Sequence, residues 1–233
     1  MRHFEMEMND LKSRLMDMSG LVQEMIKAAI GGLANRDSTL FDTVFSLEKD
    51  VNIQEIVIDD KCLKLIALNQ PVGTDLRFIT SAMKINSDLE RMGDEAVNIS
   101  ERAVNLLKYP ELKPLIDIPK MSEIVQRMVA DSIKAFNTTD VELAKTVLVK
   151  DDEADDLLKR IISTLKDIMI KSSNFETIQR AVDLIFIARS LERIGDHATN
   201  INEDVIFMVH GKDVRHPRVH VFRPETGNYS AVP

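Results

Sequence analysis

The feature that most constrains this chain is an internal repeat with a period of about one hundred residues. The segment LERMGDEAVNI at 89–99 returns 102 positions later, mostly unchanged, as LERIGDHATNI at 191–201. The match continues upstream at an offset of 103, where Glu48 corresponds to Asp151. A period of domain size indicates duplication of a whole structural unit rather than a short solenoid repeat. The predicted division is a first repeat at 1–115, a second repeat at 116–212 and a C-terminal tail at 213–233.

Each repeat is expected to fold as three long helices. No proline occurs before Pro71, and three of the seven prolines fall within 110–119, between the repeats. Because a proline inside a helix removes a hydrogen bond and clashes with the preceding turn, these positions mark helix breaks. Capping boxes of the Ser/Thr-x-x-Glu type at 139–142 and 173–176 mark helix starts. The predicted helices span 4–34, 38–69, 72–108, 119–137, 140–172 and 175–210. The predicted fold class is therefore all-α, with two tandem three-helix bundles.

Composition restricts the classes of partner. The formal net charge of −8 argues against nucleic acid, which requires a basic face. No apolar run approaches the roughly 18 residues of a membrane-spanning helix, and the acidic N-terminal segment is unlike a signal peptide. The single cysteine, Cys62, excludes an internal disulfide and fits a reducing compartment. We therefore expect a cytoplasmic protein without membrane insertion.

Oxygen-bearing side chains follow one narrow stripe of the repeated helix. With Glu90 set at zero on a helical wheel, Asp94, Asn98 and Glu101 all lie within about 80° of it, and the apolar residues lie on the far side. The second copy repeats the stripe with Glu192, Asp196, Asn200 and Glu203. The stripe contains no lysine, although an ordinary solvated helix face mixes charges of both signs. Either the stripe is a solvated face, or it binds a metal ion or a partner.

The preceding helix of each repeat carries a second acidic row. In the first repeat this row is Glu48, Asn52, Glu55 and Asp59. The second repeat keeps Asp151 and Asp155 but has Leu158 and Ile162 at the two later positions. Carboxylates at i and i+4, joined by others from a neighbouring helix, can converge on one hard cation.

Two further positions in the repeated helix lead to expectations about packing. Gly93 and Gly195 occupy the same mid-helix position, where glycine costs nearly 1 kcal/mol relative to alanine. We expect each glycine to allow close approach by another backbone. His197 replaces Glu95 of the first copy and is expected to lie on the surface, with a metal-ligand role as the alternative.

Taken together, these motifs resemble the PhoU family, the phosphate-signalling regulators of bacteria. The most specific elements are the two Leu-Glu-Arg-[Met/Ile]-Gly-Asp segments, Gln70-Pro71-x-x-x-Asp75-Leu76-Arg77 before the first, Ala188-Arg189 before the second, and the segment 211–216 after it. The resemblance covers essentially 1–215. It implies two three-helix bundles related by a pseudo-twofold axis.

The resemblance also implies a function without catalysis. Members of this family are similar to adaptors between the phosphate ABC transporter, through its ATPase subunit, and the membrane histidine kinase that senses phosphate. The expected outcome is negative regulation of the phosphate-starvation response and of phosphate uptake. A homodimer is the expected assembly.

Some members hold a multinuclear centre of iron or another metal on paired acidic motifs, so iron, zinc or another divalent cation is the expected cofactor. By position, the predicted ligands are Glu48, Asn52, Glu90 and Asp94 in the first repeat and Asp151, Asp155, Glu192 and Asp196 in the second. Asn52 departs from the acidic pattern. Possible additional ligands are Asn98, Glu101, Asn200 and Glu203.

Two functional alternatives stay open: an enzyme, and a purely structural helical module with no regulatory role. The enzyme alternative is a carboxylate-bridged di-iron oxidoreductase, a class that uses Glu-x-x-His pairs directed into a bundle core. This chain has no Glu-x-x-His sequence, and its acidic stripe lies opposite the apolar one. In the tail, the alternating residues 218–222 either form a short strand or remain without regular structure.

Overall fold

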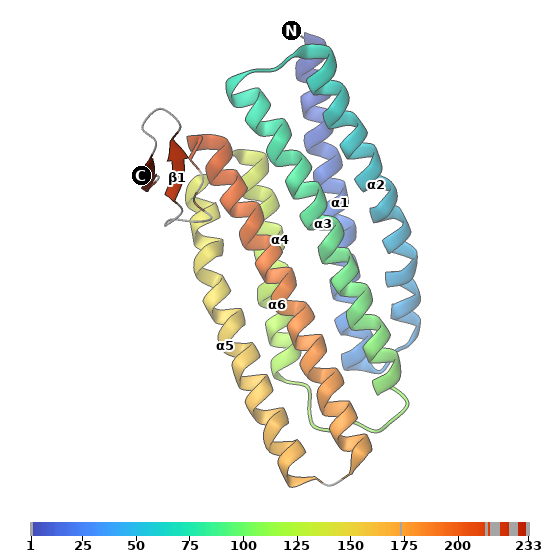
Figure 1. Cartoon of the computed structure of the whole chain (residues 1–233). Coiled ribbons are helices and arrows are strands. Elements are labelled where there is room, and N and C mark those ends of the chain that lie inside the picture. The colour runs from blue at the N-terminus through green and yellow to red at the C-terminus, as the bar shows by residue number, and fades with distance from the viewer. Residues whose placement is uncertain (1, 173, 213, 215–219, 224–227, 232–233) are drawn as a thin grey trace.

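The structure is a computed structural model that describes residues 2–172, 174–212, 214, 220–223 and 228–231. Within these residues the chain forms six long helices and a short hairpin (Figure 1). The helices are α1 (Arg2–Asn35), α2 (Thr39–Asn69), α3 (Gly73–Leu106), α4 (Asp117–Thr138), α5 (Val141–Lys171) and α6 (Phe175–His210). The hairpin pairs β1 (His220–Arg223) antiparallel with β2 (Asn228–Ala231). The all-α prediction is confirmed, and each helix begins and ends within two residues of its predicted position.

Helix starts and turns follow the local sequence closely. The predicted capping boxes lie one residue too early. The N-cap residues are Asp140 and Asn174, whose side chains accept hydrogen bonds from backbone N–H groups at the starts of α5 and α6. Between α2 and α3, Gln70 and Gly73 adopt positive φ angles of 48° and 59°, which allows the chain to reverse around Pro71. The tail contains a strand at 220–223, so the strand alternative holds for 220–222, whereas positions 218 and 219 lie outside the described residues.

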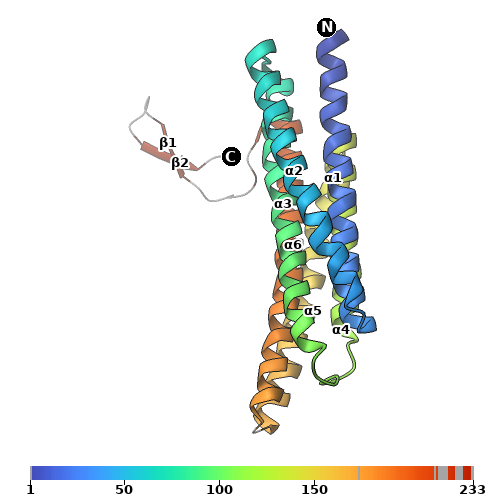
Figure 2. The ribbon, with the colours of Figure 1, turned by 90° about the vertical axis from the view of Figure 1, so that its right-hand side faces the viewer.

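The six helices form two bundles that lie side by side. The helices α1, α2 and α3 pack together, as do α4, α5 and α6, and the bundles meet where α3 contacts α6 and α1 contacts α4. α3 therefore faces α6 and α1 faces α4, and the two helices of each pair run in opposite directions (Figures 1 and 2). This antiparallel pairing of equivalent helices is the arrangement expected of a pseudo-twofold axis.

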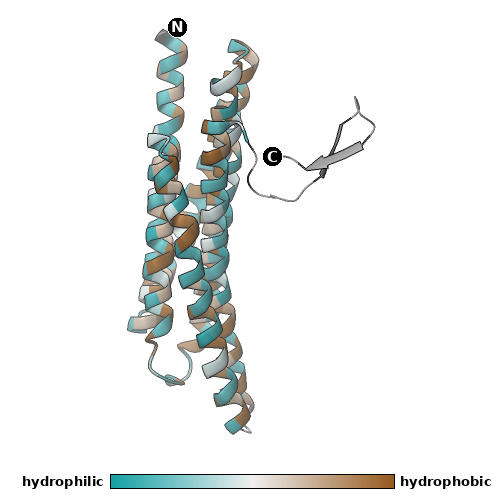
Figure 3. Ribbon diagram, turned by 90° about the vertical axis from the view of Figure 1, so that its left-hand side faces the viewer, coloured by the Kyte–Doolittle hydropathy of each residue, from teal (hydrophilic) through white to brown (hydrophobic). Residues whose placement is uncertain are grey.

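Apolar side chains fill both bundles, and methionines contribute to each. Met18, Met25 and Met92 are fully buried in the first bundle, as are Met121 and Met128 in the second. Hydrophilic and hydrophobic residues alternate along the helices in Figure 3, as expected for helices buried on one side. These flexible methionine side chains therefore help to fill the core. No helix in the described part of the chain is both long and apolar enough to cross a membrane.

The linker between the bundles is held from both sides. Arg36, at the end of α1, donates to the carbonyl oxygens of Leu107 and Tyr109 at 2.8 and 2.7 Å. Arg180 of α6 donates to the carbonyl oxygen of Pro110 at 2.9 Å. These charge-assisted bonds stabilise the linker against both repeats and so help fix how α3 lies on α6.

Candidate functional site

In the second repeat, the predicted carboxylates come together. Asp151 and Asp155 lie on α5, Glu192 and Asp196 lie on α6, and these two helices pack against each other. Burial and then the charges of Asp196 and Asp155 raise the pKa of Asp151 to about 6. Burial, followed by the neighbouring carboxylates, also raises the pKa of Glu192 and of Asp196. The four side chains therefore form one electrostatically coupled cluster, which we call the second cluster.

In the first repeat, the coupled carboxylates differ from the predicted set. Burial and then the charges of Asp94 and Glu55 raise the pKa of Glu90. The pKa of Glu55 is raised by burial, then by Asp59 and Asp94. The first cluster is therefore Glu55, Asp59, Glu90 and Asp94. The row on α2 noted in the sequence contains Glu55 and Asp59, and their i,i+4 spacing was the signal for them.

The two predicted ligands on α2 lie outside this coupled group. Glu48, which corresponds to Asp151, is half-buried, and its charge is not among those that raise the pKa of Glu90. Asn52 is exposed. Their role as metal ligands stays a prediction. Sequence reasoning missed Asn86, which is buried on α3 and donates to Asp59 at 2.9 Å, holding that carboxylate beside α3.

The two glycines lie against side chains, so the expectation of a close backbone is wrong. A Cβ added at Gly93 would lie 3.5 Å from a methyl of Val51 and 3.6 Å from the terminal methyl of Met25. A Cβ at Gly195 would lie 3.5 Å from Oδ1 of Asp151. Gly195 therefore leaves room for Asp151 beside the acidic stripe of α6.

The four possible additional ligands separate into two groups. Asn98 and Asn200 line an open groove of about 460 Å³ between α3 and α6, together with Asp94 and Asp196. Asn98 donates to Glu95 at 3.3 Å and Asn200 contacts Asp88 at 3.5 Å, so both amides point along this groove. Glu101 is exposed on α3 and Glu203 is half-buried on α6. The acidic stripes thus border the line along which the repeats meet, which we call the seam.

Ion pairs cross the seam and correct the expectation for His197. The side chain of His197 is only 17% exposed, and its Nδ1 lies 2.8 Å from Oδ1 of Asp88. His197 is therefore a seam residue and not a surface histidine. Arg193 pairs with Glu95 at 3.0 Å, and further along α3 Lys84 pairs with an aspartate of α6 at 2.9 Å. Asp88 and Lys84 were missed because nothing in a single helix shows which residue it will face.

The chemistry of the donor set fits a hard cation. In each cluster, burial and then repulsion between carboxylates raise pKa values, and a bound cation would relieve the repulsion by favouring the ionised forms. In the arrangement described, no three His, Cys, Asp or Glu side chains are gathered closely enough to hold a metal ion. Metal binding therefore stays a prediction that rests on the clusters' composition.

Comparison with known proteins decides the family. A family model described as the PhoU domain matches residues 15–103 and, a second time, residues 118–205. The chain belongs to the PhoU family. Both matches lie inside the predicted repeats, whose boundaries at 1–115 and 116–212 stay predictions.

The PhoU relatives are similar over nearly the whole chain. Homologues named phosphate-specific transport system accessory proteins include one from Aquifex aeolicus, 41% identical over 91% of this chain and 96% of that protein. The Escherichia coli protein is 32% identical over 91% of this chain and 88% of its own. The crystal structure of PhoU from Pseudomonas aeruginosa has a TM-score of 0.86 at 36% identity, covering 90% of this chain and all of that one. A PhoU from Streptococcus pneumoniae has a TM-score of 0.83 at 26% identity over 91% of this chain and 99% of its own.

Two sequence elements that mark the PhoU resemblance meet in the fold. Arg77, at the start of α3, donates through Nε to the carbonyl oxygen of Met208 at 3.0 Å. Its guanidinium also lies beside Gly211, whose positive φ of 67° ends α6. These motif residues therefore hold the end of α6 against α3.

Proposed function

We propose that this protein is a cytoplasmic negative regulator of the phosphate-starvation response and of phosphate uptake. In this proposal it is an adaptor between the ATPase subunit of the phosphate ABC transporter and the histidine kinase that senses phosphate. Membership of the PhoU family supports the proposal, as do the names of its relatives, which describe accessory proteins of the phosphate-specific transport system. The Streptococcus pneumoniae relative is described as a regulatory protein of phosphate transport.

The observation that carries the proposal is the pair of carboxylate clusters beside the seam. Each cluster joins two helices of one repeat, and the α3 and α6 stripes border the groove between the repeats. Binding of iron, zinc or another divalent cation at these clusters would favour the ionised carboxylates. The stripe surface would then present a defined charge to a partner protein.

A regulator accounts for these residues better than an enzyme does. The di-iron oxidoreductase alternative needs Glu and His ligands directed into a bundle core. Here the fully buried interior side chains are largely apolar, and the stripe residue Asp94 is exposed. The relatives compared above are named as accessory or regulatory proteins of phosphate transport, so we propose a protein without catalytic activity.

A phosphate-responsive reporter in a deletion strain tests the proposal. Without the protein, the reporter should stay active in phosphate-rich medium, and expression of the wild-type chain should restore repression. The variant Asp151→Asn with Asp196→Asn should restore less repression at equal protein level. The exposed substitution Asp50→Asn serves as the matched control and should behave as wild type. A deletion strain with normal repression would contradict the regulatory role.

A further inference from the structure

An open groove lies at the end of the molecule where α1 and α3 begin and α6 ends (Figure 1). Its volume is about 780 Å³, and residues at the starts of α1 and α3 and at the ends of α4 and α6 line it. The apolar part of the lining consists of Phe4, Met8, Phe78, Met208 and Val209. We call this the terminal groove. It shares no residue with the two carboxylate clusters.

The internal duplication places a filled counterpart of this groove at the opposite end of the molecule. Three residues of the terminal groove correspond, by the repeat offsets, to residues that line a cavity of only about 20 Å³. The pairs are Thr139 and Arg36, Met208 and Leu106, and Phe78 and Arg180. Thr139 and Arg36 also share a positive φ, of 55° and 56°, so the two helix ends have the same geometry.

The linker between the repeats fills the counterpart. Residues 107–116 are not helical, and Leu112 and Leu115 of this segment pack against the core. By the offset of 103, residues 4–13 take the place of the linker in the first repeat, and they belong to α1. Because they are helical, the space that the linker fills in the second repeat is left open in the first.

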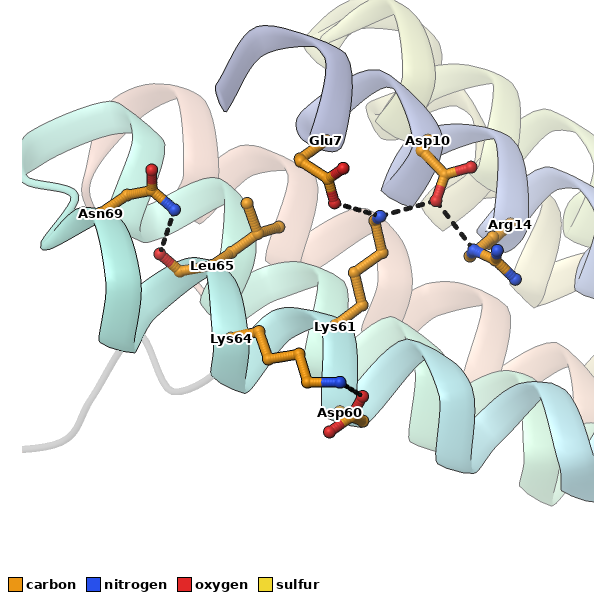
Figure 4. A network of polar contacts seen from close by, with 8 residues as sticks. All are labelled: Glu7, Asp10, Arg14, Asp60, Lys61, Lys64, Leu65 and Asn69. Carbon is orange, nitrogen blue, oxygen red and sulfur yellow. Dashed lines mark hydrogen bonds and ion pairs between the residues drawn. The ribbon is translucent and has the colours of Figure 1, made fainter. Parts of the chain in front are cut away.

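Ion pairs hold the α1 wall of the terminal groove in place. Lys61 of α2 pairs with Glu7 and Asp10 of α1, each at 2.6 Å (Figure 4). Arg14 donates to the same Asp10 carboxylate at 2.9 Å. The start of α1 is therefore fastened to α2, on one side, while Met8 lines the groove on another.

We propose that the terminal groove binds an extended, proline-containing segment of a partner protein, in which an acidic and a basic residue flank an aliphatic one. The linker is the internal template for this partner, because its sequence Pro110-Glu111-Leu112-Lys113-Pro114 has this pattern and lies in the counterpart of the groove. Prolines restrict the unbound segment, which lowers the entropy lost on binding. The methionines of the lining suit contacts with such a segment, since their side chains adapt to irregular shapes.

The charges that line the groove complement those of the linker pattern. The half-buried Lys12 of α1 lies with its Nζ 5.1 Å from the centre of the Phe78 ring. Among the described residues Lys12 forms no ion pair, so its charge is available to an incoming acid. Glu5 and Asp75 also line the groove and can pair with the basic residue on the other side of the aliphatic one.

A synthetic peptide with the linker sequence 107–116, blocked at both ends, tests this proposal. Its binding to the full chain is measured by fluorescence polarisation, with a peptide of scrambled sequence as the control. The wild-type protein should bind the linker peptide saturably and the scrambled peptide at least about tenfold more weakly. A wild-type protein that does not bind the linker peptide, because a second copy or the tail already covers the groove or because the groove takes no peptide, would overturn the proposal.

A charge swap tests the role of Lys12. Lys12→Glu should weaken binding of the linker peptide about tenfold, because an attraction to Glu111 becomes a repulsion. A peptide with Glu111→Lys should bind wild type as weakly and should bind Lys12→Glu with the affinity restored. Lys27→Glu, the same change at an exposed position of α1 outside the groove, should bind the linker peptide as wild type does. Equal binding by wild type and Lys12→Glu at equal melting temperature would overturn the proposal.

Discussion

Nδ1 of His197 lies 2.8 Å from Oδ1 of Asp88, and this contact joins α6 of the second repeat to α3 of the first. His197 occupies the position of Glu95 in the first copy, where the partner is Arg193. The symmetry-related partner of His197 would be Arg91, which offers no acceptor. The seam therefore departs from the pseudo-twofold axis at this position, and His197 contacts Asp88 instead.

Removing one partner of this contact should destabilise the protein. His197→Ala leaves the buried Asp88 carboxylate with only the long 3.5 Å contact from Asn200, so the free energy of unfolding should fall by about 1–3 kcal/mol. Asp88→Ser with His197→Ala removes both groups and should cost less than the sum of the single changes. Urea unfolding of the four proteins in this cycle measures the coupling. Additive effects would mean that the contact contributes nothing to stability.

The glycine positions should accept a methyl group but not a larger side chain. Gly93→Ala meets only ordinary contacts with Val51 and Met25, so the better helix propensity of alanine should stabilise the protein by about 0.5–1 kcal/mol. Gly93→Val overpacks the same space and should cost about 1–3 kcal/mol. Thermal unfolding of both variants checks the ordering. Equal melting temperatures for alanine and valine would contradict this description of the packing.

Stability of the metal-free protein should depend on pH through Asp151. Its pKa is raised to about 6 in the folded protein, above the unfolded value near 3.8. Between about pH 4 and pH 6, therefore, Asp151 binds a proton more strongly in the folded state than in the unfolded state. The contribution of Asp151 to stability therefore falls as the pH rises from about 4 to 6. The free energy of unfolding of Asp151→Asn should match that of wild type near pH 4 and exceed it by about 1 kcal/mol at pH 7. The difference is no larger because solvent screens this half-buried group. Asp50→Asn is the control, and an Asp151→Asn effect independent of pH would contradict the coupling.

Metal should stabilise the protein through the two clusters. Treatment with a chelator should lower the melting temperature, and iron, manganese or zinc should restore it, with about 2.7 kcal/mol gained at a metal concentration one hundred times Kd. Asp151→Asn with Asp196→Asn should remove the response of the second cluster, and Glu55→Gln with Glu90→Gln that of the first. Glu48→Gln, outside the coupled group, is the matched comparison. A full metal response in all variants would place the ion elsewhere.

Local signals allowed much of the fold to be predicted from sequence. Prolines at 110–119 and capping residues such as Asp140 act within one turn of the chain, so helix ends could be located. The repeat at 89–99 and 191–201 indicated two similar bundles. The second cluster was predicted because its four carboxylates occupy helix faces that the spacing defines.

Contacts between helices could not be predicted in the same way. Helical spacing shows which residues share a face, but not how far one helix is shifted along another. The partners of Glu90 therefore include Glu55, more than one helical turn beyond Glu48. For the same reason His197 was expected at the surface, since its partner Asp88 lies on a helix more than one hundred residues away in sequence.

The most direct test of the adaptor role is a bridging measurement with purified components. The phosphate transporter complex is immobilised in nanodiscs, and retention of the sensor kinase is measured by surface plasmon resonance with and without this protein. The account predicts that the kinase is retained only when this protein is present, and that it is retained less by Asp151→Asn with Asp196→Asn at equal protein stability. Kinase retention that is the same with and without this protein would contradict the account.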